Sequence, residues 1–172
     1  MDPAMIYYQS PFGLIAISAC DAGLLTVGFV DKPEAAPESP LPTGTRPHFS
    51  CPAQAHLDEC CRQLDEYFQG KRRQFDLPLV VTGTTFQKKV WSKLLTIPYG
   101  KTVSYREVAV AIKHPLACRA VGGACHRNKL GIIIPCHRVV GSNGQLTGYA
   151  GGLERKQLLI AFEEKHLSED AF

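Results

Sequence analysis

A cysteine followed at once by a histidine and an arginine is the part of this sequence best suited to chemistry. Cys136, His137 and Arg138 come directly after Pro135, which follows the apolar run Ile132–Ile134. The run predicts a short buried strand, and since proline cannot donate to a strand pairing, the strand should stop there and leave Cys136 at a chain reversal. A thiol beside an imidazole and a guanidinium is in an electropositive setting, which predicts a lowered pKa and a nucleophilic thiolate. A structural cysteine beside a surface histidine would fit the same residues.

A helix-turn-helix motif is predicted shortly before this cysteine. Ser104 and Glu107 have the spacing of a capping box and predict the start of a helix that runs to about Ile112. Lys113–Pro115 should end that helix, and a second helix is predicted from Leu116 to about residue 127. Two short helices across a tight turn are typical of nucleic-acid-binding motifs, although many helical hairpins bind nothing.

The second of these helices has unusually small side chains. Gly122 and Gly123 lie in its middle, where each glycine costs about 1 kcal/mol relative to alanine. Arg119 is the long cationic side chain near the middle. Small side chains allow a close approach, either by a neighbouring helix of the protein or by nucleic acid, and the pattern leaves both interpretations open.

Positive charge is concentrated in the same stretch of the chain. The net charge is only +3, but residues 86–140 carry ten basic side chains and one acidic side chain, Glu107. Residues 1–85 carry six basic and ten acidic side chains, and residues 141–172 carry three and five. A basic block interleaved with apolar residues is the pattern expected for a surface that binds a phosphate backbone, and a solvated basic face is the alternative.

The remaining patterns predict an α/β fold. They indicate strands over Ile6–Gln9, Leu14–Cys20, Leu24–Val30 and Phe75–Val81, a loop over 31–52, helix Ala53–Phe68, a helix whose apolar face holds Phe86, Val90, Trp91, Leu94 and Leu95, and a helix from about Leu153 to Lys165. Thr82–Thr84 is the best linker candidate. We therefore expect a small N-terminal α/β domain over 1–81, a linker over 82–85 and a mostly helical domain over 86–172.

The cysteine content favours free thiols over disulfides or a metal centre. Seven cysteines with no regular spacing and no CxxC pair do not form a disulfide framework or a zinc tetrad. His56 and Cys60 could share a metal on one helix face, but no convincing second pair of ligands accompanies them. We expect no metal and no cofactor. No apolar run is long enough to span a bilayer, and the N-terminus lacks the pattern of a secretory signal, so we expect a soluble intracellular protein.

The segment Ile134–Val139, Ile-Pro-Cys-His-Arg-Val, resembles the signature of the O6-alkylguanine-DNA alkyltransferases. The resemblance extends over Thr85–Glu163. Its further landmarks lie at Gly83–Gln87, Val90–Trp91, Ile97–Gly100, Ser104–Tyr105, Arg119–Ala124, Asn128, Gly148–Gly152 and Lys156. The N-terminal half is similar only through Ser10–Gly13 and its arrangement of strands. The resemblance implies a ribonuclease H-like N-terminal domain followed by a winged-helix or helix-turn-helix DNA-binding domain.

The resemblance also implies a role for each active-site residue. Cys136 would accept the alkyl group, His137 would deprotonate it through a water, and Glu163 would orient the histidine. Asn128 would tie the second helix to the active-site segment. Tyr105 would crowd the target phosphate and donate a proton to the departing guanine.

The implied partner is double-stranded DNA that contains O6-alkylguanine, bound through its minor groove, with O4-alkylthymine an open second substrate. The protein is expected to be a monomer in solution. Arg119 would enter the base stack where the flipped nucleotide was, and small residues would let the helix approach. The implied DNA and base contacts are Tyr105, Arg106, His114, Ala117, Cys118, Arg119, Ala120, Gly122, Gly123, Arg138, Val139, Ser142 and Tyr149. The basic candidates for phosphate contacts are Lys88, Lys89, Lys101, Arg106 and Lys129. Such a protein is expected in the cytoplasm, at the nucleoid of a bacterium or archaeon, or in the nucleus of a eukaryote.

The bond that would form limits the protein to one use. Displacement at an alkyl carbon by a thiolate leaves a thioether, which has no electrophilic carbonyl for water to attack. Two rival functions use the same residues differently. A Cys-His-Glu hydrolase would turn over repeatedly and would leave the basic motif unexplained. An alkyltransferase-like binding protein would lack the acceptor cysteine, which is present here as Cys136.

Two positions depart from relatives of this family. Cys20 fits one ligand of a zinc site found in some relatives, but Leu25 stands where a histidine ligand is needed, so we expect no such zinc. Gly131 stands where certain relatives have proline, which leaves open whether bulky O6 adducts are accepted. Cys118 is also unusual on a helix that would face DNA.

Overall fold

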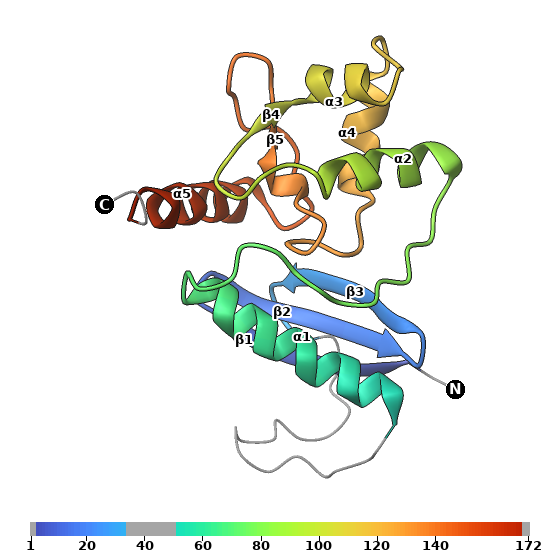
Figure 1. Ribbon diagram of the computed structural model, residues 1–172, viewed down its shortest axis with the longest axis vertical. Helices are drawn as coiled ribbons and strands as arrows, with labels where there is room; N and C mark the ends of the chain where they lie inside the picture. Colours follow the sequence, from blue (N-terminus) through green and yellow to red (C-terminus); the bar gives the residue numbers. More distant parts are fainter. Residues whose placement is uncertain (1–2, 34–50, 170–172) are drawn as a thin grey trace.

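Three antiparallel strands form a sheet in the N-terminal part of the molecule (Figure 1). The computed structural model describes residues 3–33 and 51–169. Strands β1 (Ala4–Ser10), β2 (Gly13–Cys20) and β3 (Gly23–Val30) lie in the order β1-β2-β3. The first three predicted strands are therefore confirmed. Most of the predicted loop over 31–52 lies outside the described residues.

Helix α1 (Pro52–Phe68) covers one face of this sheet (Figure 1). Its buried side chains Leu57, Leu64 and Tyr67 belong to the same apolar core as Ile15 and Ile17 of β2. Because the buried residues Leu57, Cys60, Leu64 and Tyr67 recur every three or four positions, the helix buries a single apolar stripe, and the predicted helix over 53–68 is confirmed.

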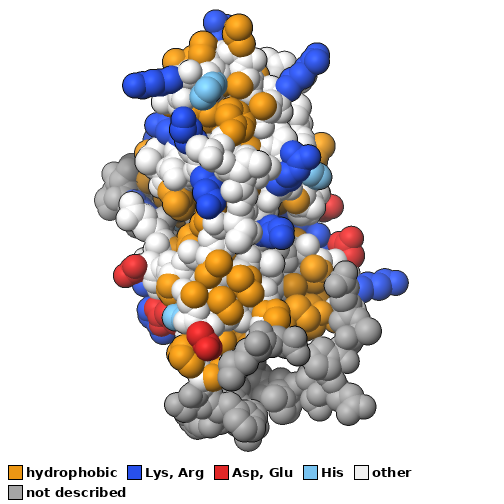
Figure 2. Space-filling view, turned by 90° about the vertical axis from the view of Figure 1, so that its right-hand side faces the viewer, with side chains coloured by type: hydrophobic (Ala, Val, Ile, Leu, Met, Phe, Trp, Pro, Cys, Tyr) orange, Lys and Arg blue, Asp and Glu red, His pale blue; other side chains and the backbone are white. Residues whose placement is uncertain are grey.

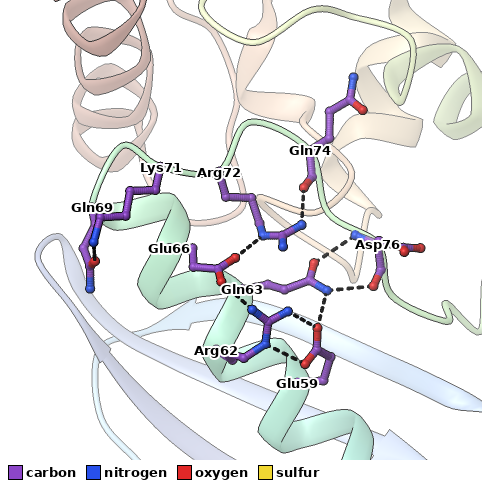
Figure 3. Close-up of polar contacts among 9 residues, drawn as sticks. All are labelled: Glu59, Arg62, Gln63, Glu66, Gln69, Lys71, Arg72, Gln74 and Asp76. Carbon is purple, nitrogen blue, oxygen red and sulfur yellow. Dashed lines mark hydrogen bonds and ion pairs between the residues drawn. The ribbon is translucent and has the colours of Figure 1, made fainter.

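A polar network ties α1 to the segment that follows it (Figure 3). The buried Gln63 side chain pairs with the backbone of Asp76, donating to its oxygen and accepting from its nitrogen, both at 2.8 Å. Arg72 donates to Glu66 at 2.6 Å and to the Gln74 carbonyl at 2.9 Å. The network holds residues 69–76 against α1 without a regular strand.

The predicted strand over Phe75–Val81 is wrong. The structure has only an isolated parallel bridge between Leu24 and Leu79 there. Leu24 donates to the Pro78 oxygen at 2.8 Å, and Val80 donates to the Leu24 oxygen at 2.9 Å. Pro78 has no N–H of its own, so the segment follows the edge of β3 without extending a ladder along it.

The rest of the described chain contains four α-helices: α2 (Thr85–Leu94), α3 (Tyr105–Ala111), α4 (Cys118–His126) and α5 (Leu153–Glu169). The predicted capping box of α3 is confirmed, since Glu107 donates its N–H to the Ser104 hydroxyl and Ser104 donates its N–H to the Glu107 carboxylate. A second capping box, between Thr84 and Gln87, starts α2. Helix α4 starts two residues later than predicted because Pro115 and Leu116 belong to the preceding turn.

A two-stranded parallel sheet joins the helix-turn-helix to the cysteine segment. Strand β4 (Val103–Ser104) immediately precedes α3, and β5 (Val139–Val140) immediately follows the short 3-10 turn Cys136–Arg138. The pairing brings the start of α3, with Tyr105, close to the turn that carries Cys136.

The predicted strand Ile132–Ile134 is also wrong. Ile134 donates its N–H to the Leu130 oxygen at 2.8 Å, and Ile132 has a positive φ of 69°, so the segment is a tight turn. Its side chains are nevertheless buried, which is why an apolar run alone could not separate strand from turn. The turn is attached to β3, since Gly131 donates to the Val27 oxygen at 2.7 Å, a bond that a proline at 131 could not make.

The architecture as a whole agrees with the predicted α/β class, with a small sheet domain followed by a helical part. Within the described residues, no helix has the length and apolar character needed to cross a membrane. Nor do the side chains of residues 3–33 and 51–168 contain a cluster of three or more histidine, cysteine or acidic residues able to hold a metal ion.

Candidate active site

Cys136 is buried at the start of its 3-10 turn and is held by the side chain of Asn128. The Asn128 amide nitrogen lies 3.3 Å from the Cys136 sulfur and donates to the Ile134 oxygen at 2.8 Å. Its amide oxygen accepts the N–H of Leu130 at 3.0 Å. Asn128 comes two residues after α4, so one side chain connects the end of that helix to the segment that carries the thiol.

The structure contradicts the predicted direction of the Cys136 pKa. Burial raises the pKa of Cys136, and neither the hydrogen bond from Asn128 nor the charge of Lys156 reverses the effect. Arg138, which was expected to favour the thiolate, instead donates to Glu163. The thiol is therefore protonated at rest, and a base is needed before it can act as a nucleophile.

His137 is fully buried next to this thiol in the chain and is oriented by Glu163. The His137 Nε2 atom lies 2.8 Å from the Glu163 Oε1 atom. Burial lowers the pKa of His137 and outweighs the charge and hydrogen bond of Glu163, which act to raise it, so the ring is neutral at neutral pH. An ionised carboxylate can only accept, so Nε2 carries the proton and Nδ1 carries the free lone pair. Nδ1 is buried and makes no hydrogen bond with any residue in the described part of the chain.

The Glu163 carboxylate accepts hydrogen bonds from four residues. Oε1 accepts from Tyr67, His137 and Arg138 at 2.7, 2.8 and 2.9 Å, and Oε2 accepts from Arg138 at 2.8 Å and from the N–H of Gly100 at 3.1 Å. Burial alone would raise the pKa of Glu163, but its interactions with His137 and Arg138 hold that pKa well below the usual range. The carboxylate therefore stays ionised and fixes the orientation of the imidazole.

Tyr67 is a site residue that the sequence did not reveal. It lies on α1, 96 positions before Glu163, and its buried hydroxyl donates to the same carboxylate oxygen as His137. Burial, reinforced by the Glu163 charge, raises the pKa of Tyr67 far above its ordinary value, so the hydroxyl remains a donor. In the sequence Tyr67 only continues the apolar face of α1, so no local pattern could have identified it.

Lys156 is a second residue whose place was not predicted, although the family resemblance includes it. Its side chain is buried, and its amine donates to the Thr147 oxygen at 2.9 Å and to the Tyr105 hydroxyl at 3.4 Å. The Tyr105 hydroxyl donates to the same Thr147 oxygen at 2.8 Å. Lys156 therefore supports both Tyr105 and the 147–148 loop, and its charge opposes the effect of burial on Cys136.

The structure favours the nucleic-acid explanation of the glycines in α4. A Cβ atom added at Gly122 would lie 3.8 Å from the Tyr105 ring, and one added at Gly123 would lie 3.7 Å from Arg127, both ordinary contact distances. The protein therefore has room for alanine at both positions, and close packing inside the protein does not explain the glycines.

The predicted DNA and base contacts range from exposed to fully buried. Arg106, His114, Arg119, Ala120 and Ser142 are exposed, while Ala117, Cys118, Gly122, Gly123 and Tyr149 are partly exposed. Val139 is fully buried after the 3-10 turn, and Arg138 is bound to Glu163 and to the Ile97 oxygen, which makes it part of the internal network instead of a DNA-facing cation.

Basic side chains gather at the end of the molecule that holds α2, α3 and α4. Figure 2 shows Lys and Arg side chains spread over the upper part of this face, whereas Asp and Glu side chains lie lower down. Glu107 is the one acidic residue between Asp76 and Glu154, and its carboxylate is bound to the Ser104 N–H at the start of α3. The field at this end therefore attracts polyanions.

Two family models match the chain in succession. One is described as 6-O-methylguanine DNA methyltransferase, ribonuclease-like domain, and matches residues 5–81. The other is described as 6-O-methylguanine DNA methyltransferase, DNA binding domain, and matches residues 85–165.

Individual relatives are similar over nearly the whole chain. The methylated-DNA--protein-cysteine methyltransferase of Methanosarcina barkeri is 46% identical over 165 residues, which cover 94% of this chain and 99% of that protein. The protein of the same name from Mycolicibacterium paratuberculosis is 43% identical, with 94% of each chain covered.

Solved structures give the same result. The fold is similar to that of Mycobacterium tuberculosis O6-methylguanine methyltransferase, with a TM-score of 0.78 at 35% identity over 96% of this chain and 94% of that one. A structure of Mycobacterium tuberculosis OGT in complex with DNA gives a TM-score of 0.78 at 38% identity, with 93% and 92% covered. The resemblance inferred from the sequence is thus confirmed, and the chain belongs to the family of 6-O-methylguanine DNA methyltransferases, also named methylated-DNA--protein-cysteine methyltransferases.

Proposed function

We propose that this protein repairs double-stranded DNA by moving the alkyl group of an O6-alkylguanine onto Cys136. The observation that carries the proposal is the fixed tautomer of His137. Glu163 accepts from Nε2 at 2.8 Å, which leaves the lone pair of Nδ1 as the base nearest in the chain to the buried thiol. A buried thiol with a raised pKa needs such a base, and the proton would reach Nδ1 through a water.

In the proposed reaction, the Cys136 sulfur attacks the alkyl carbon as its proton leaves toward His137. The new carbon–sulfur bond forms while the bond between that carbon and O6 breaks, and the electron pair passes to the guanine. Tyr105 supplies a proton to the departing guanine, and Lys156, which donates to the Tyr105 hydroxyl, favours that loss of a proton. The thioether that remains cannot be hydrolysed, so each molecule acts once. Val139, Ser142 and Tyr149 would line the base pocket.

The DNA would be contacted by α4 through the minor groove. Arg119 is exposed on the first turn of α4 and would occupy the stack in place of the flipped nucleotide. The room for a Cβ at Gly122 and Gly123 supports this arrangement, because the glycines are then explained by the approach of a duplex. We infer that the protein is a monomer in solution.

We also propose that the chain divides into an N-terminal domain over 1–81, a linker over 82–85 and a C-terminal domain over 86–172. Thr84 caps α2, which supports a boundary just before that helix. The contacts from Tyr67 to Glu163 and from Gly131 to Val27 cross this boundary, so the two domains would act as one unit at the active site.

Stoichiometry tests the proposed reaction. Incubation with excess methylated oligonucleotide should give one rapid burst that ends at one equivalent of repaired guanine per protein molecule. Intact-mass measurement of the same sample should show the gain of one methyl group. Continued release of product after the burst would instead indicate a hydrolase, and DNA binding without any gain in mass would indicate a damage-recognition protein.

Replacement of Gly123 by alanine should separate stability from DNA binding. The variant is expected to be more stable by up to about 1 kcal/mol, since alanine favours the helix and the added methyl group meets only ordinary contacts. Its affinity for duplex DNA should fall several-fold because the methyl group holds the groove away from the helix. Urea denaturation and fluorescence anisotropy measure the two effects. A stabilised variant with unchanged affinity would place the duplex elsewhere.

A further inference from the structure

Three lysines from two separate segments line one open hollow at the basic end of the molecule. The hollow has a volume of about 530 Å³ and lies between α2 and the turn that joins α3 to α4. Lys88 and Lys89 reach it from α2, and Lys113 reaches it from the turn. The hydroxyl residues Thr85 and Ser92 also line it, and no carboxylate does so in the described part of the chain.

The backbone of Lys113 has a conformation that favours glycine over lysine. Lys113 donates to the Val110 oxygen and His114 donates to the Ala109 oxygen, both at 2.9 Å, which is the Schellman arrangement at the end of α3. The residue at this position has a positive φ, here 63°, and glycine is normally found there. A side chain in this conformation is strained, because its Cβ atom lies too close to the following carbonyl oxygen. The fold of the turn therefore favours glycine, and the lysine side chain has to be explained by something else.

The hollow offers donors without any internal acceptor for them. The side chains of Lys88, Lys89 and Lys113 are exposed and form no ion pair or hydrogen bond with another residue of the described chain. Like charges that share one hollow repel one another, and an anion relieves that repulsion. Ammonium groups beside hydroxyl groups and the first turn of a helix provide suitable donors for phosphate oxygens.

The position of the hollow next to α4 indicates that the anion is the phosphate backbone of DNA. The ring of His114, next to Lys113, meets the ring of Phe86 edge-on with centroids 5.6 Å apart, which holds the turn against the start of α2. The same turn leads directly into α4. A helix that lies in a groove has a phosphate backbone on each side, so one of the two strands would pass over the turn. Resting on the proposed function, we infer that the hollow binds phosphates of one strand of the duplex that α4 contacts.

Lys113→Gly tests the site with a variant that is expected to stay folded, so weaker binding cannot be attributed to unfolding. Glycine suits the positive φ, so the melting temperature should stay the same or rise. Affinity for an undamaged 20-base-pair duplex should fall roughly 3- to 10-fold at low salt. The slope of log affinity against log salt concentration should become shallower by about 1, and by about 3 in a variant that also carries Lys88→Ala and Lys89→Ala.

Lys32→Ala is the matched control, because it removes the same charge from an exposed lysine just after β3, on the other domain. Its salt slope should equal that of the wild type. A Lys113→Gly variant whose slope also equals the wild type would overturn the assignment of the hollow. Stabilisation of the wild type by inorganic phosphate, lost in Lys113→Gly without any change in the DNA slope, would overturn it too, since the hollow would then bind a free anion. Methyl transfer from free O6-methylguanine to wild-type Cys136 tests the proposed function separately, because no phosphate backbone takes part.

Discussion

Alkyl transfer is expected to disappear when Cys136 is replaced by alanine. The side chain supplies the sulfur that would form the thioether, and no other group of the site can form that bond. The Cys136→Ala protein should still fold, since loss of one small buried side chain costs on the order of 1 kcal/mol. After incubation with a methylated oligonucleotide, its intact mass should be unchanged, whereas the wild type gains one methyl group.

Cys125→Ala is the control for this experiment. Cys125 is another buried cysteine, on α4, and burial raises its pKa to about 12, so it is protonated at rest. The Cys125→Ala protein should gain one methyl group like the wild type. If the methyl gain persisted in Cys136→Ala, peptide mapping would show which thiol carries it, and the assignment of Cys136 would be wrong.

The second large effect is expected for Glu163→Gln. The substitution removes the negative charge that faces the buried Arg138 guanidinium, and breaking a buried ion pair from one side typically costs about 3–5 kcal/mol of unfolding free energy. It also removes the carboxylate that keeps the proton on His137 Nε2. Loss of the base should slow methyl transfer by roughly 10²- to 10⁴-fold. Urea denaturation and single-turnover rates measure the two effects.

Tyr67→Phe gives a graded comparison on the same carboxylate. It removes one neutral donor from the charged Glu163 carboxylate and leaves Arg138 and His137 bound, so its cost should be about 1.5–3 kcal/mol. Its transfer rate should stay much nearer to that of the wild type than the rate of Glu163→Gln does. Equal losses in the two variants would mean that the charge of Glu163 contributes little, contrary to the network described above.

The pH dependence of the unfolding free energy of the wild type tests the same network, and this measurement does not require the Glu163→Gln variant to fold. The folded pKa of Glu163 is depressed, so its contribution to stability is present above the unfolded value of 4.5 and is lost as the pH falls through the folded value. The folded pKa of His137 is also depressed, so the unfolded chain takes up a proton that the folded chain refuses once the pH falls below about 6.5. Unfolding free energy should therefore decrease steadily from pH 7 toward pH 4. A flat profile between pH 6.5 and pH 4.5 would contradict the His137 shift, and a flat profile below pH 4.5 would contradict the Glu163 shift.

Features encoded by neighbouring residues could be predicted from the sequence. The capping box of Ser104 and Glu107 depends on two residues three positions apart, and the hairpins of β1, β2 and β3 depend on turns of two residues. The apolar run Ile132–Ile134 was correctly predicted to be buried but wrongly predicted to be a strand. The apolar side chains of this run predict that it is buried, whereas its backbone conformation depends on hydrogen bonds to Leu130 and to β3.

The direction of the Cys136 pKa shift likewise could not be predicted from neighbouring residues. The neighbours His137 and Arg138 suggested an electropositive thiol, because both basic side chains directly follow Cys136 in the sequence. In the folded chain the Arg138 guanidinium is bound to Glu163 and the thiol is buried, so desolvation decides the direction of the shift. Which way a side chain points depends on its partners, and those partners are distant in the sequence.

The sequence by itself determined the family, the thiol at Cys136 and the basic helix-turn-helix, because each is a matter of residue types at short spacings. Only the tertiary structure decided what controls that thiol. The Tyr67 hydroxyl on α1 donates to a carboxylate oxygen of Glu163 on α5, 96 positions later in the sequence. The same oxygen accepts from His137 and helps to keep the proton of the ring on Nε2. The tertiary structure likewise brings Lys113 together with Lys88 and Lys89. The physical reason is that hydrogen bonds and charges act over a few ångströms of space, and the fold decides which residues come within that range.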